Sequence, residues 1–178
     1  ANKRGITTCT SVEKSGLAEF DFEYGDDFGR RLRDAAPAFA KALVRYNPDG
    51  DSAANQNQRT RLKVLADHAH SAGLKFMFEL LVPATEGQLE SAGQDQGAYD
   101  RDVRPRLTME AIREVQEAGV EPDVWKLEGV DDREAARGIV AQARNGGRTR
   151  VGVIVLGRGE NEQRVRDWLA IGAQTAGV

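Results

Sequence analysis

The sequence has one cysteine, Cys9, and only two histidines among its 178 residues. A single cysteine excludes an intramolecular disulfide framework, and so few cysteines and histidines argue against a zinc site. His68 and His70 are two residues apart in a helical pattern, so they point in different directions and do not form a shared metal site. We therefore expect no bound metal. Cys9 lies within an apolar run, and we expect it to be a small core residue.

Long apolar runs and blocks of one charge are also missing. No uncharged apolar run is long enough to span a bilayer, and the first residues do not resemble an apolar signal segment. The net charge is −3, from 25 basic and 28 acidic residues that are interspersed along the chain. We therefore expect a soluble, cytoplasmic protein that binds neither nucleic acid nor a membrane surface.

The chain does contain a regular alternation of short apolar runs and amphipathic stretches. Branched and aromatic residues dominate most of the five runs that we predict to be strands: 6–12, 40–46, 74–82, 123–128 and 151–156. The stretches between them have helical periodicity, and three of these end at a glycine: Gly73, Gly119 and Gly146. Strict alternation of this kind predicts parallel strands that are joined by crossover helices.

Two helices have further local signals. Asp131, with Glu134 three residues later, is the pattern of a capping box and predicts the start of the helix that ends before Gly146. Val165, Trp168 and Leu169 predict a last helix.

Two folds fit this alternation, an open doubly wound sheet and a (β/α)8 barrel. Five units in 178 residues suit the open sheet, because a barrel typically needs about 250 residues. The chain begins at Ala1 without methionine and stops at Val178, where another strand would be due, so we expect it to be part of a longer protein.

The connection at 82–106 is unusually long, which predicts either a functional lid or a disordered insert.

Ionisable residues recur near the carboxyl ends of the predicted strands. On the second strand, alternation places Lys41 and Arg45 on one face and Val44 and Tyr46 on the other. A buried strand carries charges inward only with a partner or a function, and ligands of parallel α/β folds bind at the carboxyl ends of strands. For any single residue, an internal ion pair that stabilises strand register is the alternative. We expect one pocket to gather eight residues: Glu13, Lys14, Lys41, Arg45, Glu79, Lys126, Glu128 and Arg158.

The chemistry of this set suits an anionic substrate and a Schiff base. Several arginines and lysines can bind phosphate or carboxylate groups. A lysine desolvated among other cations more readily holds a neutral amine, which can attack a ketone. A nearby carboxylate, Glu79 or Glu128, can then move protons during carbinolamine dehydration and carbon–carbon cleavage. The triplet 157–159, Gly-Arg-Gly, lacks the third glycine of a dinucleotide fingerprint and predicts a turn.

Six motifs in a fixed order resemble a known family. They are VEKSG at 12–16, FDFEYG at 20–25, VRYNP at 44–48, FELLVP at 78–83, DVWKLEG at 123–129 and LGRG at 156–159. Together they resemble an aldolase-like bacterial domain family of myo-inositol catabolism, assigned as 2-deoxy-5-keto-D-gluconate 6-phosphate aldolase and fused to a sugar kinase. They are more distantly similar to class I tagatose-bisphosphate and sulfofructose-phosphate aldolases. The match covers nearly the whole chain.

The resemblance implies a (β/α)8 TIM barrel, of which residues 1–178 would be a single incomplete domain with about strands three to seven. In the distant aldolases the Schiff-base lysine lies in a Lys-x-Glu segment on strand six, which corresponds to Lys126 and Glu128. Their acid–base glutamate on strand five corresponds to Glu79, and their strand-four lysine corresponds to Lys41. The flanking Trp125 differs from the tagatose-type pattern, as does Gly129.

We therefore expect a cofactor-free class I aldolase, an aldehyde-lyase that cleaves a phosphorylated keto sugar or keto sugar acid. The best candidate substrate is 2-deoxy-5-keto-D-gluconate 6-phosphate, with dihydroxyacetone phosphate and malonate semialdehyde as products. The alternatives are an imine-free lyase or isomerase on the same barrel, and a non-catalytic sugar-phosphate-binding domain; a homo-oligomer is compatible with all three. The expected catalytic roles are imine formation by Lys126, proton transfer by Glu79, and support of the neutral amine and binding of hydroxyls by Lys41. Glu13 and Glu128 are expected to position the lysines. The expected substrate-binding residues are Glu13, Lys14, Arg45 and Arg158, of which the two arginines would bind anionic groups.

Overall fold

The computed structural model describes residues 5–178, which fold around one five-stranded parallel sheet. The strands are β1 (Cys9–Ser11), β2 (Phe39–Arg45), β3 (Lys75–Leu81), β4 (Val124–Glu128) and β5 (Gly152–Leu156). Each strand pairs with the next one along the chain, in the order β1-β2-β3-β4-β5. A doubly wound sheet would reverse direction at a switch point, whereas a barrel adds its strands in sequence. The five predicted strands and the barrel-type order are confirmed.

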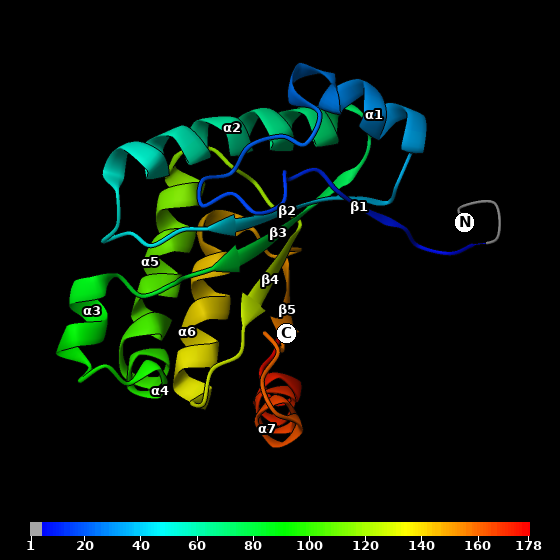
Figure 1. The fold of residues 1–178 in the computed structure, drawn as a ribbon. Helices are drawn as coiled ribbons and strands as arrows, with labels where there is room; N and C mark the ends of the chain where they lie inside the picture. The colour runs from blue at the N-terminus through cyan, green and yellow to red at the C-terminus, as the bar shows by residue number, and fades with distance from the viewer. Residues whose placement is uncertain (1–4) are drawn as a thin grey trace.

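Helices follow the strands and cover one face of the sheet (Figure 1). The long helices are α1 (Phe28–Ala35), α2 (Ser52–Ser71), α5 (Arg104–Glu117), α6 (Arg133–Ala143) and α7 (Glu162–Ala173). Short turns of helix complete the set: η2 (Gly25–Asp27), α3 (Glu86–Ser91), α4 (Gln96–Ala98), η3 (Tyr99–Val103) and η4 (Asn145–Gly147). Among the described helices, none is both long and apolar enough to cross a membrane.

The predicted helix ends are largely confirmed. Gly73 and Gly119 follow α2 and α5 with positive φ angles of 70° and 75°, a conformation that favours glycine. The predicted capping box of α6 is wrong, because the N-cap is Asp132, whose carboxylate accepts a hydrogen bond from the N–H of Ala135 at 2.7 Å. Asp131 instead accepts a hydrogen bond from the indole N–H of Trp168 at 2.6 Å.

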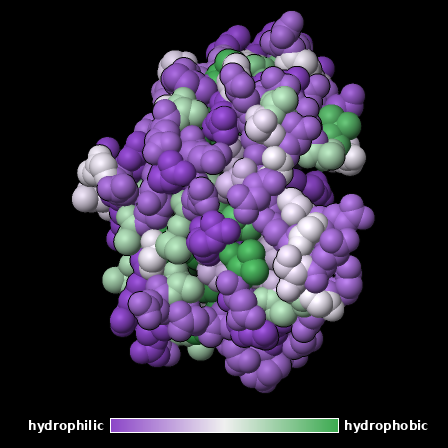
Figure 2. Space-filling view, turned by 90° about the vertical axis from the view of Figure 1, so that its left-hand side faces the viewer, coloured by the Kyte–Doolittle hydropathy of each residue, from purple (hydrophilic) through white to green (hydrophobic). Residues whose placement is uncertain are grey.

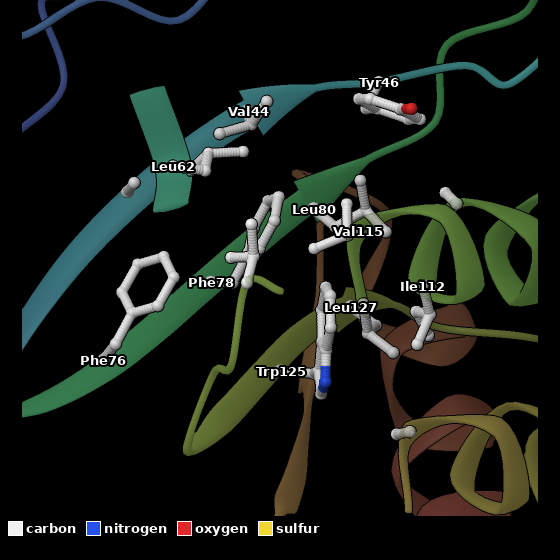
Figure 3. Packing of buried hydrophobic residues seen from close by; sticks show 14 of the residues in the cluster. Val44, Tyr46, Leu62, Phe76, Phe78, Leu80, Ile112, Val115, Trp125 and Leu127 are labelled. Carbon is white, nitrogen blue, oxygen red and sulfur yellow. The ribbon is translucent and has the colours of Figure 1, made fainter. Parts of the chain in front are cut away.

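The main core lies between the sheet and the helices. Phe76, Phe78 and Leu80 project from β3 as alternation predicts, and Phe78 stacks on Trp125 of β4 with ring centroids 4.9 Å apart (Figure 3). Side chains of α5 such as Val115 pack against this layer. The opposite face of the sheet carries the charged residues and is only partly buried. The sheet therefore has a closed outer face and a more open inner face.

The predicted burial of Cys9 is wrong. Cys9 is exposed because β1 lies at an edge of the described sheet and Cys9 shares the inner face with Ser11, the register partner of Lys41. Partial desolvation raises the pKa of the Cys9 thiol. The predicted last helix is confirmed as α7, in which Trp168 is 1% exposed and Leu169 is 52% exposed.

The connection at 82–106 is ordered, so the prediction of a disordered insert is wrong. It contains α3, α4 and η3 and leads directly into α5. Tyr99 is fully buried, and its hydroxyl donates a hydrogen bond to the carbonyl oxygen of Val82 at 2.9 Å. The segment thus packs beside the carboxyl end of β3, and its action as a lid stays a prediction.

Candidate active site

A row of four charged side chains crosses the inner face of the sheet from the end of β1 to β4. Lys126 Nζ lies 3.0 Å from Glu79 Oε1, and Lys41 Nζ lies 3.0 Å from Glu79 Oε2. Lys41 also pairs with Glu13 Oε1 at 2.7 Å. Alternation along each strand directs these side chains to the same face, and the parallel register places Glu79 directly beside Lys126. The sheet therefore brings together four of the eight predicted residues. The other four lie outside the row: Lys14, Arg45, Glu128 and Arg158.

The charges in this row stabilise one another. Burial alone would raise the pKa of Glu79, but hydrogen bonds from Lys41 and Lys126 outweigh it and lower the pKa below its ordinary value. Burial alone would lower the pKa of Lys41, but hydrogen bonds to Glu13 and Glu79 outweigh it and raise the pKa. Glu79 is therefore a carboxylate and Lys41 an ammonium near neutral pH. The Lys126 side chain is 28% exposed, against 6% for Glu79, so Lys126 is the more accessible group.

A second charged cluster, beside the row, contains Glu128 and Arg158. Arg158 donates to Glu128 Oε1 at 2.6 Å and to Asp100, while Glu128 Oε2 accepts from the N–H of Val82 at 2.9 Å. Arg104 pairs with the buried Asp100 at 3.1 Å. The prediction that Glu128 positions the lysines is wrong, because both of its oxygens bind other groups.

Arg158 differs from the prediction as well. Its guanidinium contacts the carboxylates of Asp100 and Glu128, and Glu160 lies 3.3 Å away. Burial alone would lower its pKa, but the hydrogen bonds to Asp100 and Glu128 outweigh it and raise the pKa. Because carboxylates already surround this cation, it does not present a free positive charge to an anionic ligand, contrary to the expected role. The predicted turn at 157–159 is confirmed, with Arg158 at a φ of 50°.

Sequence reasoning missed Asp100 and Arg104. Both are almost fully buried, and they form an i, i+4 ion pair in the segment that precedes and begins α5. The spacing is a usable signal for a helical ion pair. Their burial could not be inferred, because it depends on how 82–106 folds over the ends of β3 and β4.

The remaining predicted residues, Lys14 and Arg45, lie beside the row. They line a pocket together with Glu13 and the loop that follows β1. Figure 2 views the molecule from the side toward which β2 and β3 point in Figure 1, and it shows hydrophilic residues around a central group of hydrophobic ones. The eight predicted residues therefore form three neighbouring groups instead of one.

The histidines have structural contacts, as predicted. His68 contacts the carbonyl oxygen of Gly29 at 3.2 Å, and His70 contacts Asp123 at 3.0 Å. Within residues 5–178 no group of histidine, cysteine and acidic side chains has the arrangement of a metal site.

Comparison with solved structures shows which class of fold this site belongs to. The chain is similar to the crystal structure of PbGH5A, a glycoside hydrolase family 5 enzyme from Prevotella bryantii B14, with a TM-score of 0.57 and 12% sequence identity. The match covers 91% of this chain and 58% of that chain, so this chain spans little more than half the length of that enzyme. Such low identity shows the fold alone, which is a parallel α/β barrel of the TIM type.

The family follows from the sequence itself. Residues 1–178 match the family described as "Uncharacterized protein conserved in bacteria (DUF2090)", and the chain belongs to that family. No curated protein matches this chain.

Proposed function

We propose that this chain carries the Schiff-base centre of a class I aldolase that cleaves a phosphorylated keto sugar or keto sugar acid. The observation that supports this best is that Glu79 contacts Lys126 and Lys41 through its two oxygens, both at 3.0 Å. An amine, a carboxylate in direct contact with it and a second fixed cation are the groups that imine chemistry requires. The family resemblance favours 2-deoxy-5-keto-D-gluconate 6-phosphate as substrate.

Imine formation begins with a proton transfer across the short contact in the row. Lys126 gives a proton to Glu79 Oε1, which leaves a neutral amine and a carboxylic acid. The amine nitrogen forms a bond to the ketone carbon, and a proton moves from nitrogen to oxygen to give a carbinolamine. Glu79 then protonates the hydroxyl group, which leaves as water. The products of this stage are a protonated imine on Lys126 and the Glu79 carboxylate.

Cleavage uses the regenerated carboxylate of Glu79 as a base. It removes the proton from the hydroxyl that is β to the imine carbon, the carbon–carbon bond breaks, and the bonding electron pair moves into the protonated imine. An aldehyde leaves and an enamine stays on Lys126. Protonation of the enamine carbon by Glu79 and hydrolysis of the imine then release the ketone product, which is dihydroxyacetone phosphate for the favoured substrate.

Lys41 has a supporting role in this scheme. An ammonium has three donors, of which two bind Glu13 and Glu79. The third can bind a substrate hydroxyl or the oxygen that becomes negatively charged, which is the kind of preorganised stabilisation that favours a transition state. The raised pKa of Lys41 supports this role, because the group keeps its charge during turnover.

Borohydride trapping in the intact protein tests the proposal. Incubation with dihydroxyacetone phosphate and borohydride, followed by peptide mass mapping, is expected to find a reduced adduct on Lys126. The Lys126→Met variant is expected to form none, whereas Lys63→Met, at an exposed lysine of α2 that pairs with Asp67, is expected to react like the wild type. No adduct, or an adduct on another lysine, would reject the Schiff-base centre and favour an imine-free lyase or a binding domain.

A further inference from the structure

The pocket beside the charged row, which we name the Lys14–Arg45 pocket, is continuous with the candidate active site. Its walls are the loop 14–20 and the carboxyl end of β2. Glu13 belongs to both places, since it lines the pocket and pairs with Lys41 at 2.7 Å. A substrate bound at Lys126 and Glu79 would therefore meet this pocket at one of its ends.

This pocket carries two positive charges that the protein does not compensate. In the part of the chain that the structure describes, neither Lys14 nor Arg45 pairs with a carboxylate, and both are exposed. Of the acidic residues of the pocket, Glu13 pairs with Lys41 through Oε1 and Glu19 pairs with Arg61 at 2.6 Å, whereas the buried Oε2 of Glu13 has no hydrogen-bond partner among the described residues. The charged groups Lys41, Lys126 and Arg158 at neighbouring strand ends each contact a carboxylate.

The walls of the pocket are held in place by α2. The side chain of Gln58, which is 2% exposed, accepts a hydrogen bond from the N–H of Phe20 at 2.9 Å and donates one to the carbonyl oxygen of Arg45 at 3.1 Å. Arg61 donates to the carbonyl oxygen of Phe20 at 3.0 Å. The N–H groups of residues 15–18, which line the pocket, donate to no other described residue. Hydrogen bonds from α2 thus fix both sides of the pocket, whose lining includes N–H groups and two cations that have no partner among the described residues.

We propose that the Lys14–Arg45 pocket binds a terminal oxyanion, a carboxylate or a phosphate, on the fragment of the substrate that leaves as the aldehyde. This assignment rests on the proposed function, because it assumes that the imine carbon lies at Lys126. Arg45 is on β2 and Lys126 on β4, two strand spacings apart, and Arg45 lies two residues beyond the register position of Lys126, so about 12 Å separates their backbones. An open-chain hexose derivative has a comparable length. The guanidinium fork and the ammonium group both complement an oxyanion.

Titration with inorganic phosphate, and separately with acetate, tests the pocket. With ¹⁵N-labelled intact protein, the amide signals of residues 15–18 are expected to shift and saturate with at least one of the two anions. Arg45→Ala and Lys14→Ala are each expected to weaken that binding by about tenfold or more. The matched control is Arg137→Ala, which removes another exposed arginine without a carboxylate partner, on α6, and is expected to bind like the wild type. Unshifted signals of residues 15–18, or equal binding by Arg45→Ala and Arg137→Ala, would overturn the proposal.

Two further measurements separate this proposal from the aldolase. Lys126→Met is expected to bind the anion normally although it forms no borohydride adduct. A normal adduct on Lys126 together with unchanged anion binding in Arg45→Ala would reject the pocket and leave the aldolase intact. In turnover, Arg45→Ala is expected to raise KM for the complete substrate more than it lowers kcat, and an unchanged KM would overturn the role of the pocket in substrate binding.

Discussion

Glu79 and Lys126 are register partners on adjacent parallel strands, and their charged atoms lie 3.0 Å apart. The second oxygen of the same carboxylate binds Lys41. One acidic side chain therefore contacts both amines of the candidate site. Because Glu79 takes part in most of the proposed proton transfers, it is the position at which a substitution separates catalysis from folding most clearly.

Glu79→Gln is expected to lower kcat for aldol cleavage by about 10²- to 10⁴-fold, which is the usual range for the loss of a general acid–base group. Glutamine has nearly the same shape and can still accept hydrogen bonds from the lysines, so the fold is expected to persist. Steady-state kinetics on the purified protein measures the effect. Glu90→Gln, at an exposed position of α3, is the control, and equal turnover of the two variants would contradict the prediction.

Lys41→Met is expected to lower the free energy of unfolding by about 3 kcal/mol, because it leaves two mostly buried carboxylates, Glu13 and Glu79, without their shared cation. Urea unfolding at neutral pH measures this loss. Adding Glu13→Gln to Lys41→Met is expected to restore part of the stability. Lys63→Met removes an exposed pair and is expected to cost under about 1 kcal/mol; an equal loss in both single variants would contradict the prediction.

Asp100 makes part of the stability dependent on pH. Burial alone would raise its pKa, but the hydrogen bond from Arg158 and the charge of Arg104 hold the pKa below its ordinary value of 3.8. A lowered pKa in the folded state stabilises the protein above pH 3.8, and this contribution is lost as the pH falls from there through the folded-state pKa.

Asp100→Asn is therefore expected to be less stable than the wild type at neutral pH and to lose less stability on acidification. Urea unfolding between about pH 6 and pH 2 gives the two curves, which are expected to approach each other at the acidic end. Asp34→Asn, at an exposed position of α1, is the control and is expected to follow the wild type. Parallel curves for Asp100→Asn and the wild type would show that the carboxylate is not stabilised as proposed.

Gly129→Ala is expected to destabilise the fold by about 1–3 kcal/mol, because the added Cβ would overlap the indole ring of Trp168. That ring is buried and its N–H binds Asp131, so it cannot move aside freely. Thermal unfolding measures the effect. In α3, Gly87→Ala meets no atom within 4 Å and is expected to be neutral or to raise stability by about 0.5 kcal/mol. A similar Tm for both variants would refute the clash.

Much of the fold was predictable because the signals are local. Alternation along β3 assigns Phe76 and Phe78 to the helix-covered face, and the structure has both rings fully buried. The same rule put Lys41 on the opposite face, where it lies. The rule says nothing about which strand is at an edge, and for that reason the burial of Cys9 was mispredicted.

The candidate site was predictable only in part. Residue type and strand position suggested that Lys126 and Glu79 lie at the same height along their strands, and the parallel register makes them neighbours. The partners of Glu128 and Arg158 could not be inferred, because they come from a distant segment. When 82–106 packs beside β3 and β4, it brings Asp100 into contact with Arg158. The carboxylate then neutralises the charge of that arginine.

The sequence by itself determined the alternation of strands and helices, the face on which each charge lies and the membership of a bacterial family, because each depends on residue type and spacing along the chain. Only the tertiary structure decided which charges neutralise one another. An ion pair depends on distances of a few ångströms between strands and loops, and those distances follow from register and loop packing. Among residues 5–178, Lys14 and Arg45 thus pair with no carboxylate while Arg158 does, although all three are basic residues near strand ends.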